Sequence, residues 1–211
     1  MNQRPIALLG AGGHARVASE ALRLIRTPVA GYLAPEPSQT SADLGPYLGN
    51  DENLAKLASK MDFVLGVGFV NGFGIQRRQQ LLSHLAELGA CLRTVVHPHA
   101  FVSPSARLEA GVFVAMGAMV GVNSYVGRAA IVNSGAIVDH DSRLGANSHI
   151  ATGARLAGGV TIGENVLIGI GSIVREGQSV HDNAVVAAGA VVVQDVPTGV
   201  TVMGTPAKSK T

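Results

Sequence analysis

The second half of the chain repeats a large aliphatic residue every six positions. Sixteen consecutive steps, from residue 102 to residue 192, all carry Val, Leu or Ile. They are Val102, Leu108, Val114, Val120, Val126, Val132, Val138, Leu144, Ile150, Leu156, Ile162, Ile168, Val174, Val180, Val186 and Val192. An amphipathic helix needs a period of 3.6 and an ordinary strand a period of 2, so neither explains the pattern. A six-residue repeat instead predicts short strands joined by tight corners and stacked as coils around one aliphatic column.

The composition agrees with a stacked coil. The residue after each aliphatic position is often Gly or Ala, and the fourth residue after it is often Ala or Ser. Glycine reaches 27 of 211 residues, whereas aromatic residues make up only 4 %. Each six-residue unit therefore has room for one aliphatic and one small side chain, and rings rarely fit.

The first 94 residues lack the six-residue period and read as alternating strands and helices. We expect strands over 6–9, 29–33, 63–67 and 93–96, and helices over 15–25, 52–58 and 75–88, with Asn50 capping the second helix. Alternation of this kind predicts a small parallel sheet. The chain is thus divided into an α/β domain, residues 1–94, and a repeat domain, residues 95–211.

The turn Gly10-Ala-Gly-Gly-His14 follows the first predicted strand and opens the first helix. Glycines at such a turn let a phosphate approach the backbone, and a helix N-terminus attracts an anion. A tight turn without a ligand is the alternative. A redox NAD site is disfavoured, because the second strand ends at Ala34-Pro35 without the acidic residue that would bind a ribose.

Charge and cysteine content exclude several classes of protein. The net charge of +2, with no long run of one sign, argues against nucleic acid as a partner. The single cysteine, Cys91, excludes an internal disulfide framework; we expect it to be buried and not to act as a nucleophile. Since no leader pattern or 18-residue apolar run is present, we predict a cytoplasmic protein without a membrane partner.

The repeat resembles the hexapeptide-repeat proteins, and the segment from Asp195 to Lys208 is similar to the one that ends the coil in their acyltransferase branch. The resemblance implies a left-handed parallel β-helix of about five coils. It also implies homotrimers with acetyl-CoA bound between neighbouring β-helices. The glycine turn and the repeat, taken together, resemble one subgroup of this family. It contains sialic acid O-acetyltransferases and the N-acetyltransferases of nucleotide-linked 4-amino-4,6-dideoxy sugars such as bacillosamine and perosamine.

Membership of this subgroup implies that the α/β domain binds the nucleotide of a sugar substrate. The residues that it assigns to the substrate are Gly12, Gly13, His14, Gly68, Asn71 and Asn133. Relatives that bind a uridine nucleotide often carry acidic residues where this chain has Ala34 and Pro35. The base therefore stays open among GDP, UDP and dTDP, with something other than uridine slightly favoured.

His140 lies within Asp139-His140-Asp141 in the middle of the coil. Acetyl transfer to an amine requires a base, and a neutral imidazole suits this task near neutral pH. A neighbouring carboxylate can orient the ring and stabilise its charged form, provided that a corner brings the two side chains together. The resemblance assigns catalysis to His140 and Asp141; Asp139 is a rival partner, and a solvated corner histidine is the alternative.

The resemblance also assigns a set of residues to acetyl-CoA. His149 is expected near the thioester, and the N–H of Gly158 is expected to meet the thioester carbonyl. Ile170, Arg175 and Lys208 complete the set. His149 lies half a coil from His140, so it would reach the same site only across a subunit boundary.

The resulting prediction is an acetyl-CoA-dependent N-acetyltransferase in polysaccharide biosynthesis that acts on the C4 amine of a GDP-perosamine-like or UDP-linked sugar. A sialic acid-type O-acetyltransferase is the alternative. A zinc enzyme resembling the β-helix carbonic anhydrases is less favoured, because His97, His99, His140 and His149 lack the spacing of that family. A non-catalytic nucleotide sensor or scaffold is also disfavoured by the His-Asp pair. No metal is expected.

Overall fold

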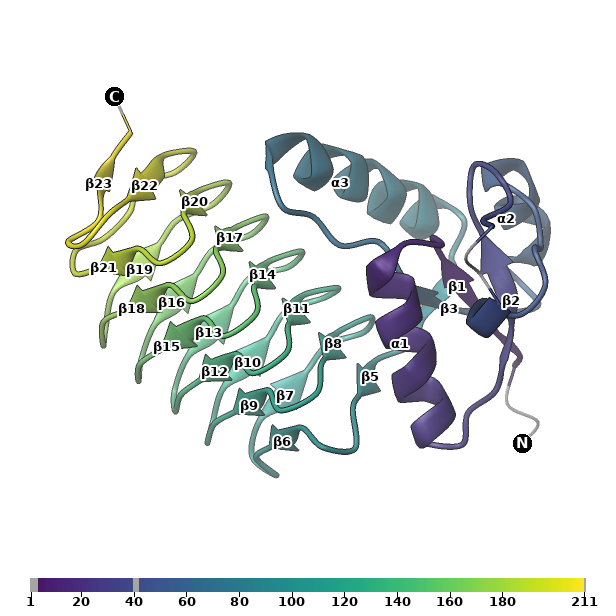
Figure 1. Cartoon of the computed structure of the whole chain (residues 1–211), viewed down its shortest axis with the longest axis horizontal. Helices are drawn as coiled ribbons and strands as arrows, with labels where there is room; N and C mark the ends of the chain where they lie inside the picture. The colour runs from purple at the N-terminus through teal and green to yellow at the C-terminus, as the bar shows by residue number, and fades with distance from the viewer. Residues whose placement is uncertain (1–3, 40–41, 211) are drawn as a thin grey trace.

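The computed structural model describes residues 4–39 and 42–210. An α/β domain is followed by a left-handed parallel β-helix of about six turns, as Figure 1 shows. No helix in the described ranges has the length and apolar character needed to cross a membrane.

The α/β domain is built on a four-stranded parallel sheet with the order β2-β1-β3-β4. Its elements are β1 (Ile6–Leu9), α1 (Gly13–Leu24), β2 (Val29–Leu33), the 3-10 helix η1 (Ala42–Leu44), α2 (Asp51–Leu57), β3 (Asp62–Leu65), α3 (Gly72–Glu87) and β4 (Cys91–Leu92). The side chain of Asn50 caps α2, as predicted, by accepting from the N–H of Glu52.

The prediction of a single strand over 93–96 is wrong. The fourth strand of the α/β sheet ends at Leu92, and Val95–Val96 (β5) already pairs with β8 of the coil. Residues 97–99 form the first corner of the coil. The short segment 91–96 thus contributes one strand to each of two sheets, and its composition alone does not reveal where the division falls.

Three sheets form the faces of the β-helix. The covered sheet, named for the α/β domain that lies on it, contains β5 (Val95–Val96), β8 (Phe113–Val114), β11 (Ile131–Val132), β14 (His149–Ile150), β17 (Leu167–Ile168), β20 (Val185–Val186), β22 (Thr201–Met203) and β23 (Lys208–Ser209). The apolar sheet contains β6 (Phe101–Val102), β9 (Met119–Val120), β12 (Ile137–Val138), β15 (Arg155–Leu156), β18 (Ile173–Val174) and β21 (Val191–Val192). The polar sheet contains β7 (Arg107–Leu108), β10 (Tyr125–Val126), β13 (Arg143–Leu144), β16 (Thr161–Ile162) and β19 (Ser179–Val180).

The predicted aliphatic column is the core of the coil. The second residue of each two-residue strand points inward, and Val114, Ile150 and Ile168 are fully buried there. The column is longer than the sequence run predicts, because Val96 and Val202 continue it at the two ends.

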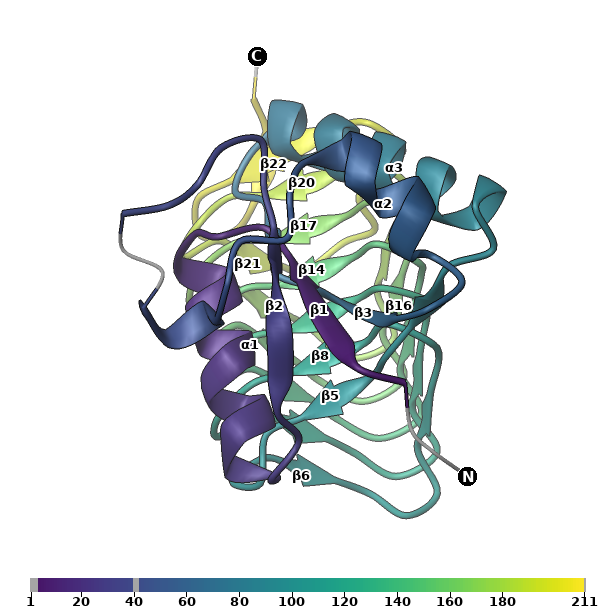
Figure 2. The same cartoon turned by 90° about the vertical axis from the view of Figure 1, so that its right-hand side faces the viewer.

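The α/β domain packs on the covered sheet, as Figure 2 shows. The outward residues Phe113 and Ile131 of this sheet are buried in the same cluster as Ala15 and Ala18 of α1. Further along the coil, Leu167 packs against the start of α3. One face of the coil is therefore already occupied within the chain, and it joins the two domains.

Replacing Leu144 with alanine is expected to lower the free energy of unfolding by about 2–5 kcal/mol, because the side chain is 1 % exposed and its loss interrupts the column. The preceding residue, Arg143, is exposed on the polar sheet and provides the control. Its replacement with alanine should change the same quantity by no more than about 0.5 kcal/mol. Chemical denaturation at one protein concentration measures both; equal losses would contradict the assignment of the core.

Candidate functional site

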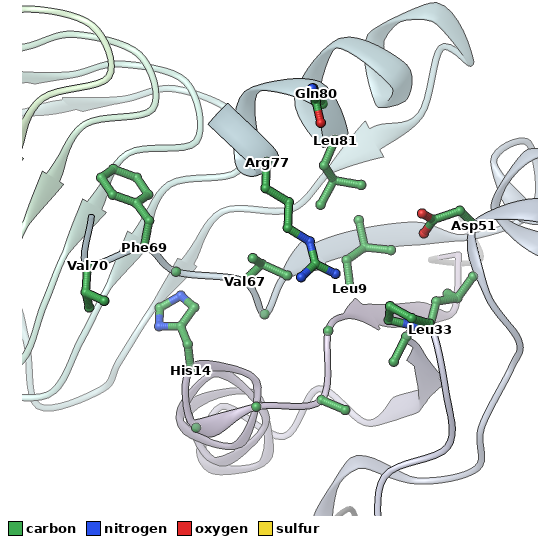
Figure 3. Close-up of a pocket in the computed structure, with 18 of the residues that line it drawn as sticks. Leu9, His14, Leu33, Asp51, Val67, Phe69, Val70, Arg77, Gln80 and Leu81 are labelled. Atoms are coloured by element: carbon green, nitrogen blue, oxygen red, sulfur yellow. The ribbon is translucent and has the colours of Figure 1, made fainter. Parts of the chain in front are cut away.

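A cavity of about 740 Å³ lies between the α/β domain and the coil. Its walls are the glycine loop 10–14, the end of β2 at 33–35, the segment 66–70 after β3, and one face of α3 (Figure 3). Asn133 and His149 close it on the side of the coil. Since these walls include the carboxyl ends of parallel strands, the cavity lies where open α/β sheets bind ligands.

The structure brings most of the predicted substrate residues together in this cavity. Gly12, Gly13, Gly68 and Asn133 all line it. Helix α1 begins at Gly13 with no side-chain cap and no acidic residue in its first turn, so its N-terminal N–H groups favour an anion. Asn71 is the exception: it caps α3 by accepting from the N–H of Gly74 at 2.9 Å and does not line the cavity.

His14 lines the cavity and has one ring nitrogen that makes no hydrogen bond with the described residues. The residue is half-buried as a whole, but its Nε2 is buried and has no hydrogen-bond partner among the described residues. Burial, with smaller contributions from Arg78 and His149, lowers the pKa of His14 to about 3. The ring packs edge-on against Phe113, with 5.0 Å between the ring centroids. The imidazole of His14 is therefore neutral and has one buried nitrogen without a hydrogen bond in the described part of the chain.

His149 also lies in this cavity, with the predicted substrate residues. Its Nδ1 donates to the carbonyl oxygen of Phe69 at 2.8 Å, and Asn133 Nδ2 donates to its Nε2 at 3.1 Å. Burial lowers the pKa of His149 to about 4, so the ring is neutral and its tautomer is fixed. The structure separates His149 from the other residues expected at acetyl-CoA, because its strand lies in the covered sheet and faces the α/β domain.

Arg78, which the sequence analysis did not single out, is buried beneath the cavity at 1 % exposure. Its Nε donates to the carbonyl oxygen of Val67 at 2.7 Å, and a guanidinium nitrogen donates to the side-chain oxygen of Asn147. The guanidinium carbon lies 5.9 Å from the centroid of the Phe69 ring, and Asn147 in turn donates to Asn165 at 2.8 Å. No carboxylate in the described ranges forms an ion pair with Arg78.

Burial lowers the pKa of Arg78 to about 9, which leaves the group charged near neutral pH. Arg78 therefore connects the cavity wall at Val67 and Phe69 to a corner of the coil at Asn147. Its charge also contributes positive potential beside the cavity. The sequence held one signal for this burial. Arg78 comes three residues after Ile75, so a helix places the two side chains on the same, apolar face of α3.

Replacing Arg78 with methionine should lower the free energy of unfolding by about 2–4 kcal/mol, because it removes one hydrogen bond within the α/β domain, to Val67, and one that ties this domain to the coil, to Asn147. Arg77, the exposed neighbour whose side chain lies in the cavity, is the control, and its methionine variant should be within about 0.5 kcal/mol of the parent. Unfolding curves for the two variants that coincide would show that the buried arginine does not hold the domains together.

A second cluster lies at the corner of the coil between the apolar and polar sheets. There His140 Nδ1 and Asp141 Oδ2 are 2.8 Å apart. Asp139 instead accepts from the backbone N–H of His140 at 2.7 Å, so Asp141 is the partner of the ring. Asp141 adopts a left-handed backbone with φ of 57°, and the corner thus brings the two neighbouring side chains together. Both side chains are exposed in the single chain.

The electrostatics of this corner keep the two groups paired. The hydrogen bond that His140 donates to Asp141, followed by the charge of Asp139, raises the pKa of His140 above its ordinary value. The same bond, followed by that from Asn123, lowers the pKa of Asp141. The imidazole is thus a stronger base than a free histidine. Asp141 holds it through Nδ1, which leaves Nε2 for other contacts.

Gly158 lies one coil beyond His140 at the same corner. A Cβ placed on Gly158 would come within 2.5 Å of Cε1 and Nε2 of the imidazole, so only glycine leaves room for this ring position. Arg175 follows on the next coil and is exposed. The predicted residues His140, Gly158 and Arg175 therefore form a row along one edge of the β-helix.

Other predicted acetyl-CoA residues lie elsewhere. Ile170, 61 % exposed, is at the corner between the covered and apolar sheets, on the opposite edge of the apolar sheet from His140. Lys208 is exposed on β23 at the end of the coil. Neither His140 nor Asp141 lines the cavity, because the width of the apolar sheet lies between that corner and Asn133. A single chain does not bring His140 to the cavity.

Cys91 is exposed, so the expectation that it is buried is wrong. It begins the edge strand β4, where only one neighbouring strand covers it, and it does not line the cavity. Among residues 4–39 and 42–210, no three histidine, cysteine or acidic side chains are grouped closely enough to hold a metal ion.

Comparison with family models gives two matches. Residues 5–83 match the PglD N-terminal domain, and residues 159–194 match the hexapeptide repeat of succinyl-transferase. A search of curated proteins gave no match.

Solved structures match over nearly the whole chain. Perosamine N-acetyltransferase from Caulobacter crescentus, in complex with CoA and GDP-perosamine, is 36 % identical, with 98 % of this chain and 97 % of that chain covered and a TM-score of 0.90. The acetyltransferase domain of PglB from Neisseria gonorrhoeae, in complex with acetyl coenzyme A, is also 36 % identical, with 99 % and 100 % covered and a TM-score of 0.90. WeeI from Acinetobacter baumannii has the same fold at 23 % identity, with 98 % and 99 % covered and a TM-score of 0.81.

Proposed function

The chain belongs to the hexapeptide-repeat sugar acetyltransferases that carry a PglD N-terminal domain, and from this premise we propose that it acetylates the C4 amine of a nucleotide-linked 4-amino-4,6-dideoxy sugar. It is an acetyltransferase with acetyl-CoA as its co-substrate. The observation that carries the proposed acceptor is the cavity, whose uncapped α1 N-terminus suits the diphosphate of a nucleotide sugar.

In the proposed reaction His140 is the general base. The sugar amine attacks the thioester carbonyl carbon, and Nε2 of His140 takes a proton from the nitrogen as the new C–N bond forms. Asp141 holds the ring through Nδ1 and stabilises the imidazolium. The N–H of Gly158 donates to the carbonyl oxygen as it gains negative charge, the C–S bond breaks, and the thiolate of CoA leaves and recovers the proton.

An amine acceptor is favoured over a hydroxyl because the perosamine N-acetyltransferase, which acts on an amino sugar by name, matches this chain over nearly its whole length. A zinc enzyme finds little support in the geometry. His149 has both ring nitrogens bonded to Phe69 and Asn133 in the cavity, whereas His140 lies on a different edge of the coil. These imidazoles do not converge on one position.

We also propose a homotrimer in which each active site is shared between two copies. The apolar sheet and its edge expose Phe101, Met116, Met119, Ile170 and Ile173. Packing this sheet against a neighbour would bury the exposed row and bring His140 of one copy toward the cavity of the next. We place the enzyme in the cytoplasm, where acetyl-CoA is available, and its product in polysaccharide biosynthesis.

The purified protein should give an acetylated product, detected by mass spectrometry, with at least one member of a panel of UDP-, GDP- and dTDP-linked 4-amino sugars. His140→Asn should lower kcat by about 10²–10⁴-fold, because the base is lost, without a change in melting temperature. His181→Asn, at another exposed corner, is the control and should keep full activity. Failure with every amino sugar, or normal turnover by the His140 variant, would refute the proposal.

The pH dependence should reveal the role of Asp141. Since His140 acts when neutral and its pKa is raised, kcat/KM should fall on the acid side at a pH above the ordinary value of 6.5. In Asp141→Asn the main cause of the shift is removed, so the acid limb should move to lower pH, and the remaining charge of Asp139 should keep part of the shift. Asparagine tolerates the left-handed backbone at this position. An acid limb at the same pH in both proteins would contradict the pairing.

A further inference from the structure

Opposite sides of the cavity differ in chemistry. One end meets the coil at Asn133 and His149, and the other reaches Asp51 at the start of α2. Figure 3 shows His14 and Asp51 on opposite sides of the cavity, with the guanidinium of Arg77 between them. Because a projection can only shorten a separation, these two residues lie at well separated points of the wall.

This arrangement orients a nucleotide sugar, an argument that rests on the proposed function. The sugar must lie at the end formed by Asn133 and His149, since acetyl transfer takes place on the coil. The diphosphate then lies at the N-terminus of α1, where the charge of Arg77 faces the glycine loop. The base is left at the remaining end, beside Asp51.

Asp51 is the one acidic side chain among the described residues that line the cavity. Its carboxylate has no hydrogen-bond or ion-pair partner in the described part of the chain. A carboxylate in a cavity for a dianionic diphosphate is unfavourable unless it lies away from the phosphates and accepts hydrogen bonds. Its position at the far end meets the first condition, and a base with paired donors would meet the second.

Among the common bases, guanine presents two adjacent donors, N1–H and the N2 amino group, which match the two oxygens of a carboxylate. Uracil and thymine present one N–H between two carbonyl oxygens, which would face the carboxylate unfavourably. Leu33 and Leu81 lie on the same side of the cavity as Asp51 (Figure 3) and can cover the faces of a purine ring. We propose that Asp51 is a specificity-determining residue that selects a guanine nucleotide, so that the substrate is a GDP-linked amino sugar.

Titration calorimetry of the full chain with GDP, IDP, UDP and XDP tests this proposal without requiring turnover. GDP should bind at least about tenfold more tightly than UDP, and IDP, which lacks the N2 amino group, should bind about tenfold more weakly than GDP. Asp51→Asn should lose about tenfold or more of the affinity for GDP. It should gain affinity for XDP, because the new amide can donate to the 2-oxo group of xanthine.

Glu52→Gln provides the matched control, since Glu52 is the next residue of α2, is exposed and does not line the cavity. It should retain the preference for GDP. A gain of affinity for XDP cannot come from misfolding, so the test does not depend on a loss alone. Equal affinities for GDP and UDP in the parent protein, or an unchanged preference in Asp51→Asn, would overturn the proposal.

Binding and acetylation measurements on the parent protein distinguish this inference from the proposed function. Tight GDP binding without acetylation of any GDP-linked amino sugar would support the role of Asp51 in selecting guanine. It would contradict the proposal that a nucleotide-linked amino sugar is the acceptor. Acetylation of a UDP-linked sugar together with tighter UDP binding would keep the proposed function and reject the role of Asp51.

Discussion

The continuous aliphatic column of the coil is the constraint on which the remaining structure depends. Each six-residue unit can bury its Val, Leu or Ile only against the units above and below it, so the units stack in register. Registered stacking repeats each corner position at the spacing of neighbouring strands, about 4.8 Å. His140 and Gly158 are therefore neighbours because they are 18 residues apart, and the ring stands where a Cβ on Gly158 would be. The geometry of the proposed catalytic corner is a direct consequence of the repeat.

The same stacking explains why the cavity and His140, the proposed general base, are separated in one chain. A coil with three flat faces gives each face one role: the covered sheet holds the α/β domain, the polar sheet faces solvent, and the apolar sheet retains exposed Met119 and Ile173. Asn133 and His140 lie at the two edges of the apolar sheet and cannot approach each other within a rigid prism. In the proposed homotrimer, association of copies through this sheet would therefore serve catalysis as well as stability.

The sequence predicted the elements whose rules are local and missed those that depend on contacts between the domains. The hexad period, the strand Ile6–Leu9 and the cap at Asn50 each follow from spacing or from a single turn. The assignment of Val95–Val96 was wrong because pairing partners, not composition, decide the sheet to which a short strand belongs. Arg78 lay outside the prediction for the same reason, since its partners Val67 and Asn147 come from two different domains.

The buried charge of Arg78 gives a physical reason for the neutral histidines around the cavity. Desolvation is the largest cause of the low pKa of His14 and of His149, and the nearby guanidinium adds to it in both. If either imidazole were charged, it would stand beside an unpaired cation in a region of low dielectric, which costs more than loss of its proton. The cavity therefore has two neutral rings in its wall, His14 and His149, with the charge of Arg77 in the wall and the buried charge of Arg78 beneath it. The attraction that these arginines offer an anionic ligand is therefore not opposed or altered by a change of charge on His14 or His149 near neutral pH.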